Sequence, residues 1–231
     1  MRHARPALIA AIAVVGALAA PAPANDPPAS APGAPEGALN PWVLEVMREY
    51  PVDGSFGYHW PKSGGWEGAT QDVVWGGRVL AKGDPQRRSY CCGLTFEVYV
   101  RALQRAQGGD VPGLDADTLH EARLRFFGDS RRERERKRLV QFALESLRLG
   151  ESVPHAQARA GDFVQLWRTD ESGHQAVFVN WLWKKDEIVG LTYWSTQPST
   201  RGIGYRSELV GQGGVDLAQV HVGRAAWPLR R

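Results

Sequence analysis

At residues 89–96 the sequence reads Ser-Tyr-Cys-Cys-Gly-Leu-Thr-Phe, and a helix is predicted to begin at Cys91. The residues that follow it at helical spacing are apolar, namely Leu94, Val98 and Ala102. The pair Gly108-Gly109 is expected to end this helix near Gln107. In the first turn of a helix, unpaired N–H groups and the positive end of the dipole lower the pKa of a thiol. The position of Cys91 therefore suits a nucleophile, and the same N–H groups suit an oxyanion.

The cysteine content supports this interpretation. The chain has only two cysteines, Cys91 and Cys92, and they are adjacent. Adjacent cysteines close only a strained ring, so the chain has no ordinary disulfide framework. A thiol kept free in an exported protein favours nucleophilic chemistry. The alternative is that both cysteines are small buried apolar residues.

The N-terminus has the pattern of a secretory signal. Arg2 and Arg5 precede an apolar run, and a small-x-small cleavage site ends at Ala24. The run is short for a membrane span. We therefore expect residues 1–24 to be removed on export, which gives a secreted or periplasmic protein with no stable membrane insertion. An uncleaved anchor is the alternative.

The remainder of the chain is expected to form one domain. Residues 25–39 are rich in Pro and Ala and are predicted to be a disordered leader. Residues 40–231 are enough for a single core. Removal of the signal takes away two arginines and no acid, which lowers the formal charge from +3 to +1. This charge gives no reason to expect a nucleic-acid partner, and a monomer is expected.

Helices are predicted first and strands second. Asn40 is expected to cap a first helix with Pro41 inside it, and Gly76-Gly77 is expected to turn a hairpin. Two more helices are expected after the Cys91 helix, from Asp115 or Asp117 to Phe127 and from Ser130 to Leu149. Strands are then expected at Phe163–Arg168, His174–Trp183, Glu187–Thr196, Ile203–Leu209 and Leu217–Val222. This order predicts an α+β fold with the N-terminal helices packed on a C-terminal antiparallel sheet.

His174 is the favoured partner for the thiol. It opens a predicted strand directly after the Ser172-Gly173 turn. A histidine at the end of a sheet that faces a helix N-terminus has the geometry of a Cys–His pair. Among the six histidines, His221 on the late strand is the alternative.

Three short elements resemble the NlpC/P60 family. Cys91-Cys92-Gly93-Leu94-Thr95 resembles its Cys-Ser-Gly-Leu-Val helix start. Ala160-Gly161-Asp162-Phe163-Val164 is similar to its Pro-Gly-Asp-Leu-Val element, and Gly173-His174-Gln175-Ala176-Val177-Phe178-Val179 to its Gly-His-Val-Gly-Ile-Tyr-Val element. They occur in the family's order and cover roughly residues 70–200. The related CHAP amidases follow the same logic. The resemblance implies a papain-like fold and a cysteine peptidase or amidase that cleaves amide bonds, typically in the peptides of peptidoglycan.

Carried over residue by residue, the resemblance implies Cys91 as nucleophile and His174 as base. Cys92 stands where the family has Ser, so the choice between the two cysteines stays open. A third polar residue is expected on the strand after His174, where it orients the imidazole. CHAP-like spacing favours Gln197 there, with Ser195 second.

The substrate-binding surface is expected beside these residues. Trp66 lies in a loop and Trp194 beside the third position, so both are predicted to line a cleft, with Tyr90 and Cys92 flanking the nucleophile. No spacing of ligands predicts a metal, and no cofactor is expected. The expected substrate is a peptidoglycan peptide or another amide.

Three further interpretations remain open from the sequence. The first is a non-catalytic binding module of the cell envelope on the same fold. The second is a redox pair formed by the two cysteines. The third concerns the charged run at 131–138, which is a solvated helix face or a patch for an anionic polymer.

Overall fold

The computed structural model describes residues 37–61, 66–109, 111, 113–128 and 137–227. The predicted signal peptide, residues 25–36 of the predicted leader and most of the charged run at 131–138 lie outside the described residues. Ordered structure begins before the expected domain boundary at residue 40. Ala38 forms a bridge with Ala226, and Leu39 is buried and donates its N–H to the carbonyl of Ala225 at 2.9 Å.

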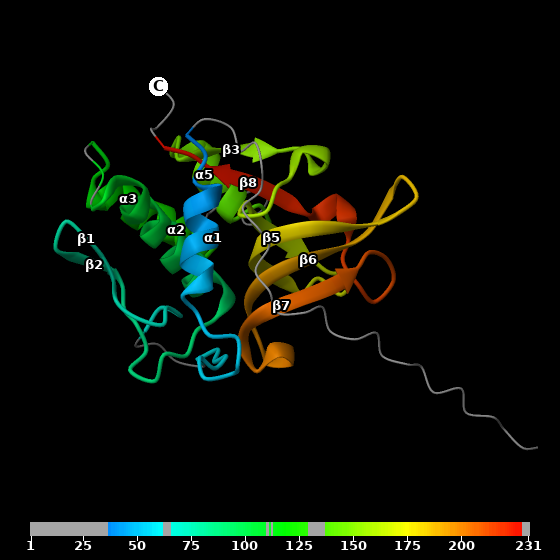
Figure 1. Cartoon of the computed structure of the whole chain (residues 1–231), viewed down its shortest axis with the longest axis horizontal. Helices are drawn as coiled ribbons and strands as arrows, with labels where there is room; N and C mark the ends of the chain where they lie inside the picture. Colours follow the sequence, from blue (N-terminus) through cyan, green and yellow to red (C-terminus); the bar gives the residue numbers. More distant parts are fainter. Residues whose placement is uncertain (1–36, 62–65, 110, 112, 129–136, 228–231) are drawn as a thin grey trace, which may run out of the picture.

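Helices form one side of the molecule and a large sheet forms the other (Figure 1). The described α-helices are α1 (Asn40–Arg48), α2 (Cys91–Gln107), α3 (Ala116–Phe126) and α5 (Val140–Ser146). The α2 helix begins and ends as predicted, with Gly108 in the left-handed conformation at its end. α3 is capped by Asp115, whose side chain accepts the N–H of Thr118.

The large sheet is antiparallel throughout, which confirms the predicted α+β class. Its strands are β3 (Gly150–Val153), β4 (Phe163–Trp167), β5 (Gly173–Lys184), β6 (Glu187–Gln197), β7 (Gly202–Leu209) and β8 (His221–Ala225). Their spatial order is β3-β8-β4-β5-β6-β7. The predicted hairpin is also present, as a separate pair of strands, β1 (Val73–Trp75) and β2 (Arg78–Ala81).

The structure corrects three local predictions. Asn40 is not a side-chain cap but lies in the first turn of α1. Of the predicted helix from Ser130 to Leu149, the described residues form only α5, from Val140 to Ser146: residues 137–139 form a turn, Arg148 adopts a left-handed conformation and Gly150 starts β3. The predicted last strand begins too early, since Leu217–Gln219 form a 3-10 turn before β8.

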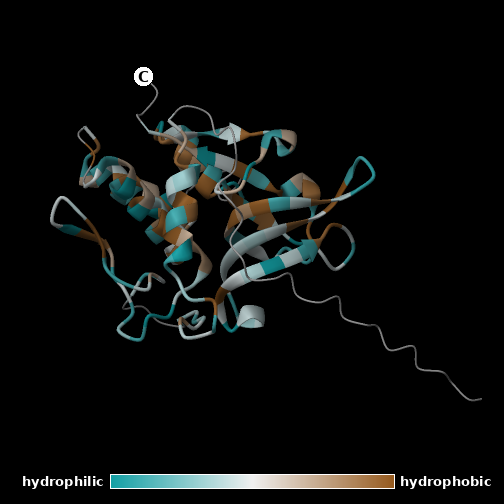
Figure 2. Ribbon diagram, in the orientation of Figure 1, coloured by the Kyte–Doolittle hydropathy of each residue, from teal (hydrophilic) through white to brown (hydrophobic). Residues whose placement is uncertain are grey.

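Apolar side chains fill both faces of the sheet. Val177, Trp194 and Ile203 join the core against α1 and α2, and Phe178 and Tyr193 belong to a second cluster. Figure 2 shows hydrophilic residues gathered at the outer loops, including the turn between β5 and β6. No helix within the described residues is long and apolar enough to cross a bilayer. Because neighbouring residues of a strand alternate between faces, His174 and Gln175 contact different surroundings.

A buried ion pair joins the start of α1 to the sheet. Arg224 of β8 donates to both carboxylate oxygens of Asp162, each at 2.8 Å. The Asn40 side chain donates to Asp162 Oδ1 at 2.8 Å and to the carbonyl of Ala160 at 3.0 Å. The Asp162 side chain is 0% exposed and that of Arg224 is 6% exposed. This use of its amide explains why Asn40 does not cap the helix.

Replacing Asp162 is expected to destabilise the domain strongly. In Asp162→Ala, Arg224 is left buried without a counter-charge, a change that typically costs about 3–5 kcal/mol. Urea denaturation followed by circular dichroism measures the loss. Asp117→Ala is the matched control, because its pair with Arg78 is exposed, at 88% and 46%, and is expected to change stability little. Equal midpoints for the two variants would contradict this role for Asp162.

Candidate active site

The nucleophile candidate lies where the sequence placed it, at the first residue of α2. Tyr90 is the N-cap, with extended backbone and no side-chain cap bond. The N–H groups of the first turn have no intrahelical acceptors, so they and the helix dipole are directed at the region around Cys91. Cys91 is half-buried, whereas Cys92 is buried, and both cysteines are free. Cys91 is thus the less buried of the two cysteines.

Gly93 lets a loop approach the start of α2 closely. A Cβ atom on Gly93 would collide with the backbone of Gly68 and the carbonyl of Glu67. Gly68 itself has a φ of +74°, and its carbonyl accepts the N–H of Tyr90 at 3.1 Å. Only glycine fits at both points of contact. The loop is therefore held against the residue that precedes the nucleophile.

A buried side-chain bond docks α2 on β5. The Thr95 hydroxyl donates to Gln175 Oε1 at 2.8 Å, although the two residues are 80 positions apart. Gln175 Nε2 in turn donates to the carbonyl of Phe126. Since Gln175 follows His174 in β5, this bond fixes the histidine's part of the strand relative to the start of α2.

The structure brings Cys91 and His174 together. A hydrogen bond from the Cys92 thiol lowers the pKa of Cys91 most, and burial opposes it. The pKa of Cys91 is lowered further by a hydrogen bond from His174, by the charge of the His174 ring and by the backbone N–H of Gln175. It therefore lies well below the ordinary pKa of a thiol. These are the surroundings that stabilise a thiolate.

The two cysteines are not equivalent. Their sulfur atoms are 3.8 Å apart. Hydrogen bonding to Cys91, burial and the charge of Cys91 all raise the pKa of Cys92. The opposite directions of the two pKa shifts place the proton on Cys92 and the negative charge on Cys91. Cys92 is therefore a donor to the thiolate, and its position is that of a supporting group.

Both predicted candidates for the third polar residue are buried behind His174. Ser195 Oγ donates to the backbone carbonyl of Gln175 at 2.7 Å. Its hydroxyl supports the strand that carries His174. Gln197 contacts the Tyr193 hydroxyl at 3.0 Å, and the Tyr193 ring lies 5.4 Å from that of His174, centroid to centroid. His174 Nε2 is hydrogen-bonded to neither residue within the described part of the chain, so the choice between Gln197 and Ser195 stays a prediction.

An aromatic cluster borders the nucleophile. Tyr90 contacts the rings of Trp60 and Trp66, with centroids 4.7 and 5.5 Å apart, and Trp66 stacks on His59 at 5.9 Å. Trp66 and Tyr90 thus lie together, and their role as a binding surface stays a prediction. Two further residues of this region were not expected from the sequence. Trp60 is 57% exposed, and burial and the charges of Cys91 and Cys92 raise the pKa of Tyr58.

Trp194 does not line a cleft, which corrects the prediction. It is fully buried and packs on Tyr50, with ring centroids 5.5 Å apart. The reason is strand alternation: Trp194 points to the opposite face from Tyr193 and Ser195. The alternative base, His221, pairs in register with Gln165 on β4. Burial, followed by the charges of Arg138, His155 and Lys137, lowers its pKa, and neither cysteine is among these neighbours.

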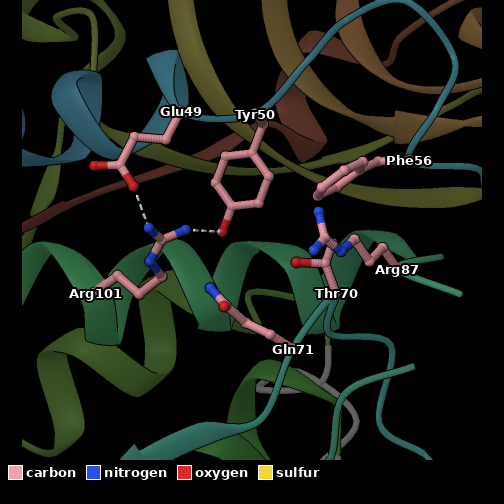
Figure 3. A pocket seen from close by; sticks show the side chains of 7 residues that line it. All are labelled: Glu49, Tyr50, Phe56, Thr70, Gln71, Arg87 and Arg101. Carbon is pink, nitrogen blue, oxygen red and sulfur yellow. Dashed lines mark hydrogen bonds and ion pairs between the residues drawn. The ribbon is translucent and has the colours of Figure 1, made fainter. Parts of the chain in front are cut away.

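A cavity of about 280 Å³ lies elsewhere, between the end of α1 and the middle of α2 (Figure 3). Arg101 on its wall donates to the Tyr50 hydroxyl at 2.9 Å and to Glu49. Tyr50 also donates to Glu97, whose pKa is raised by burial although hydrogen bonds from Thr70 and Tyr50 oppose this. None of the predicted site residues lines this cavity. Arg101, Tyr50 and the two glutamates hydrogen-bond to one another, so we assign this cluster to the stability of the fold and not to a binding site.

No protein-family model matches the chain, and neither a curated protein nor a solved structure matches it. Within the described part of the chain, no group of three or more His, Cys, Asp and Glu is placed to hold a metal ion.

Cys92→Ala is expected to raise the pKa of the Cys91 thiol, because it removes the largest contribution that lowers it. The rate of alkylation by iodoacetamide, measured from pH 5 to 10, reports this pKa. The variant should react more slowly than wild type in the acidic part of the range and equally fast above the ordinary thiol pKa of about 8.5. Cys92→Ser is the control, since its hydroxyl still donates and should preserve most of the shift. Superimposable profiles for wild type and Cys92→Ala would contradict this role of Cys92.

Proposed function

We propose that this protein is a cysteine hydrolase of papain-like architecture that cleaves an amide bond, with Cys91 as nucleophile and His174 as general base. The observation that carries the proposal is the interaction of the thiol of half-buried Cys91 at the start of α2 with the imidazole of β5. A thiolate held by an imidazole and a helix N-terminus is the activated nucleophile of such enzymes.

The groups at hand account for a complete reaction. The Cys91 thiolate attacks the amide carbonyl carbon, and first-turn N–H groups of α2 stabilise the negative oxygen. Protonated His174 gives its proton to the leaving amine as the C–N bond breaks. His174 then takes a proton from water, which attacks the thioester and releases the carboxylic acid. Cys91 returns to the thiolate and His174 to its protonated form.

The proposed substrate is a peptide of peptidoglycan. Three features support it: the signal-like N-terminus, the resemblance to NlpC/P60 elements and the aromatic cluster around Tyr90 beside the thiol. Aromatic faces of this kind stack on sugar rings and on peptide planes. The same features imply a protein that acts outside the cytoplasm.

Cys91→Ala is expected to abolish cleavage of purified peptidoglycan, with products identified by mass spectrometry. Loss of a nucleophile typically reduces turnover by a factor on the order of 10⁴ or more. Cys92→Ser is the matched control: it changes the neighbouring sulfur and should retain activity. Full activity of Cys91→Ala would exclude the mechanism. Binding of wall material without cleavage by the wild-type protein would instead indicate a binding module.

His174→Ala is expected to slow the alkylation of Cys91 at neutral pH, because a hydrogen bond and a positive charge that favour the thiolate are lost. Peptide mapping after iodoacetamide treatment locates the label. His221→Ala is the control, and its labelling should equal that of wild type. Equal labelling of the His174→Ala variant would mean that the ring does not activate the thiol.

A further inference from the structure

A chain of buried polar side chains continues from the site into the sheet. The Tyr193 hydroxyl contacts Gln197 at 3.0 Å and donates to Glu208. Arg168 donates to the two oxygens of Glu208, from Nε at 2.7 Å and from Nη2 at 2.6 Å. Arg206 lies 3.2 Å from the same carboxylate. The Glu208 side chain is only 7% exposed, so these contacts are well protected from water.

The count of protons fixes the direction of each hydrogen bond. Two arginines keep Glu208 ionised: burial would raise its pKa, but hydrogen bonds from Arg168 and Tyr193 and the charges of Arg168 and Arg206 lower it. A carboxylate only accepts, and a tyrosine has one proton to donate. Tyr193 gives that proton to Glu208 and must therefore accept from Gln197.

This direction decides which way the Gln197 amide faces. The nitrogen and oxygen of an amide are assigned from their partners, and only the NH₂ group can donate to Tyr193. The oxygen then occupies the other arm of the amide, which is buried and has no partner among the described residues. Nε2 of His174 is likewise buried without a partner there. Continuing the register from Val177 and Trp194 toward the strand ends sets His174 opposite Gln197.

We propose that Tyr193 and Glu208 are positioning residues that turn the carbonyl oxygen of Gln197 toward His174, where it accepts the Nε2–H. The neutral ring is then held in the tautomer whose Nδ1 carries no proton, so that Nδ1 is the nitrogen that gives and takes the proton in the reaction. The same oxygen stabilises the protonated ring, because it faces an N–H donor. The inference rests on the proposed function, since it assigns a task to residues that touch neither substrate nor thiol.

Nitrogen NMR of ¹⁵N-histidine-labelled protein tests the tautomer directly. In the Cys91→Ala chain, at about pH 9, where imidazoles are ordinarily neutral, the His174 ring is expected to carry its proton on Nε2. His174→Ala assigns the signal. Adding Tyr193→Phe removes the partner that orients the Gln197 amide, so the amide can rotate. The His174 ring is then expected to be a mixture of Nε2–H and Nδ1–H forms. With Cys91 present, Tyr193→Phe should reduce alkylation at pH 6 about tenfold, the lower range for loss of a supporting hydrogen bond.

Tyr99→Phe is the matched control. It also removes a buried tyrosine hydroxyl, one without a partner within the described residues and remote from the site in the core of α2. In the Tyr99→Phe variant, the tautomer of His174 and the alkylation rate of Cys91 should equal those of the protein with Tyr99 intact. An Nδ1–H ring in the Cys91→Ala chain would overturn the proposal, and so would an unchanged tautomer in Tyr193→Phe. No substrate is used in these NMR and alkylation measurements. If they give the expected tautomers but the wild-type protein does not cleave peptidoglycan, the proposed function is contradicted and the role of Tyr193 and Glu208 is not.

Discussion

The bond between Thr95 and Gln175 is the contact on which the site depends. It is buried, it joins the first turns of α2 to the start of β5, and the other arm of the Gln175 amide donates to the carbonyl of Phe126. Breaking it would leave a buried amide oxygen unpaired, which is costly in a medium of low polarity. Because Gln175 follows His174 directly, a shift of this contact would move the imidazole relative to the thiol.

Packing and hydrogen bonding hold the other side of the nucleophile. The loop around Gly68 approaches Gly93 so closely that a side chain at either position would collide with its neighbour. Tyr90, between loop and helix, is held by its backbone bond to Gly68 and by the aromatic rings around it. The start of α2 is therefore fixed on two sides, by the loop and by β5. A thiol in so rigid a position has a stable orientation toward its surroundings, which is what pre-organised chemistry requires.

Much of the fold could be predicted because it follows from local patterns. The limits of α2, the hairpin around Gly76-Gly77 and the long strands β5 and β6 follow from periodicity and from glycine. One failure occurs where a distant residue decides the local structure. The Asn40 side chain could cap the helix, but it donates instead to Asp162, which lies 122 positions away in the sequence.

The candidate site divides in the same way. Cys91 and His174 could be chosen from the sequence because each opens a regular element. Trp194 was misplaced, since proximity along a strand does not mean proximity in space. Trp60 and Tyr58 had no signal in the sequence, because their nearness to Tyr90 and to the thiols depends on the path of an irregular segment.

The motif residues that resemble a known family serve two different purposes here. Cys91 and His174 interact with each other, whereas Asp162, in the second element of the resemblance, is buried against Arg224 and Asn40. It links α1, β8 and the start of β4, and β4 is the neighbour that pairs with β5 through His174 and Leu166. An ion pair of this kind contributes little net stability compared with apolar packing, but it allows only one arrangement of the elements that it joins. We infer that this ion pair fixes the register of β4 against β5, the strand that carries His174, more specifically than a purely apolar contact would.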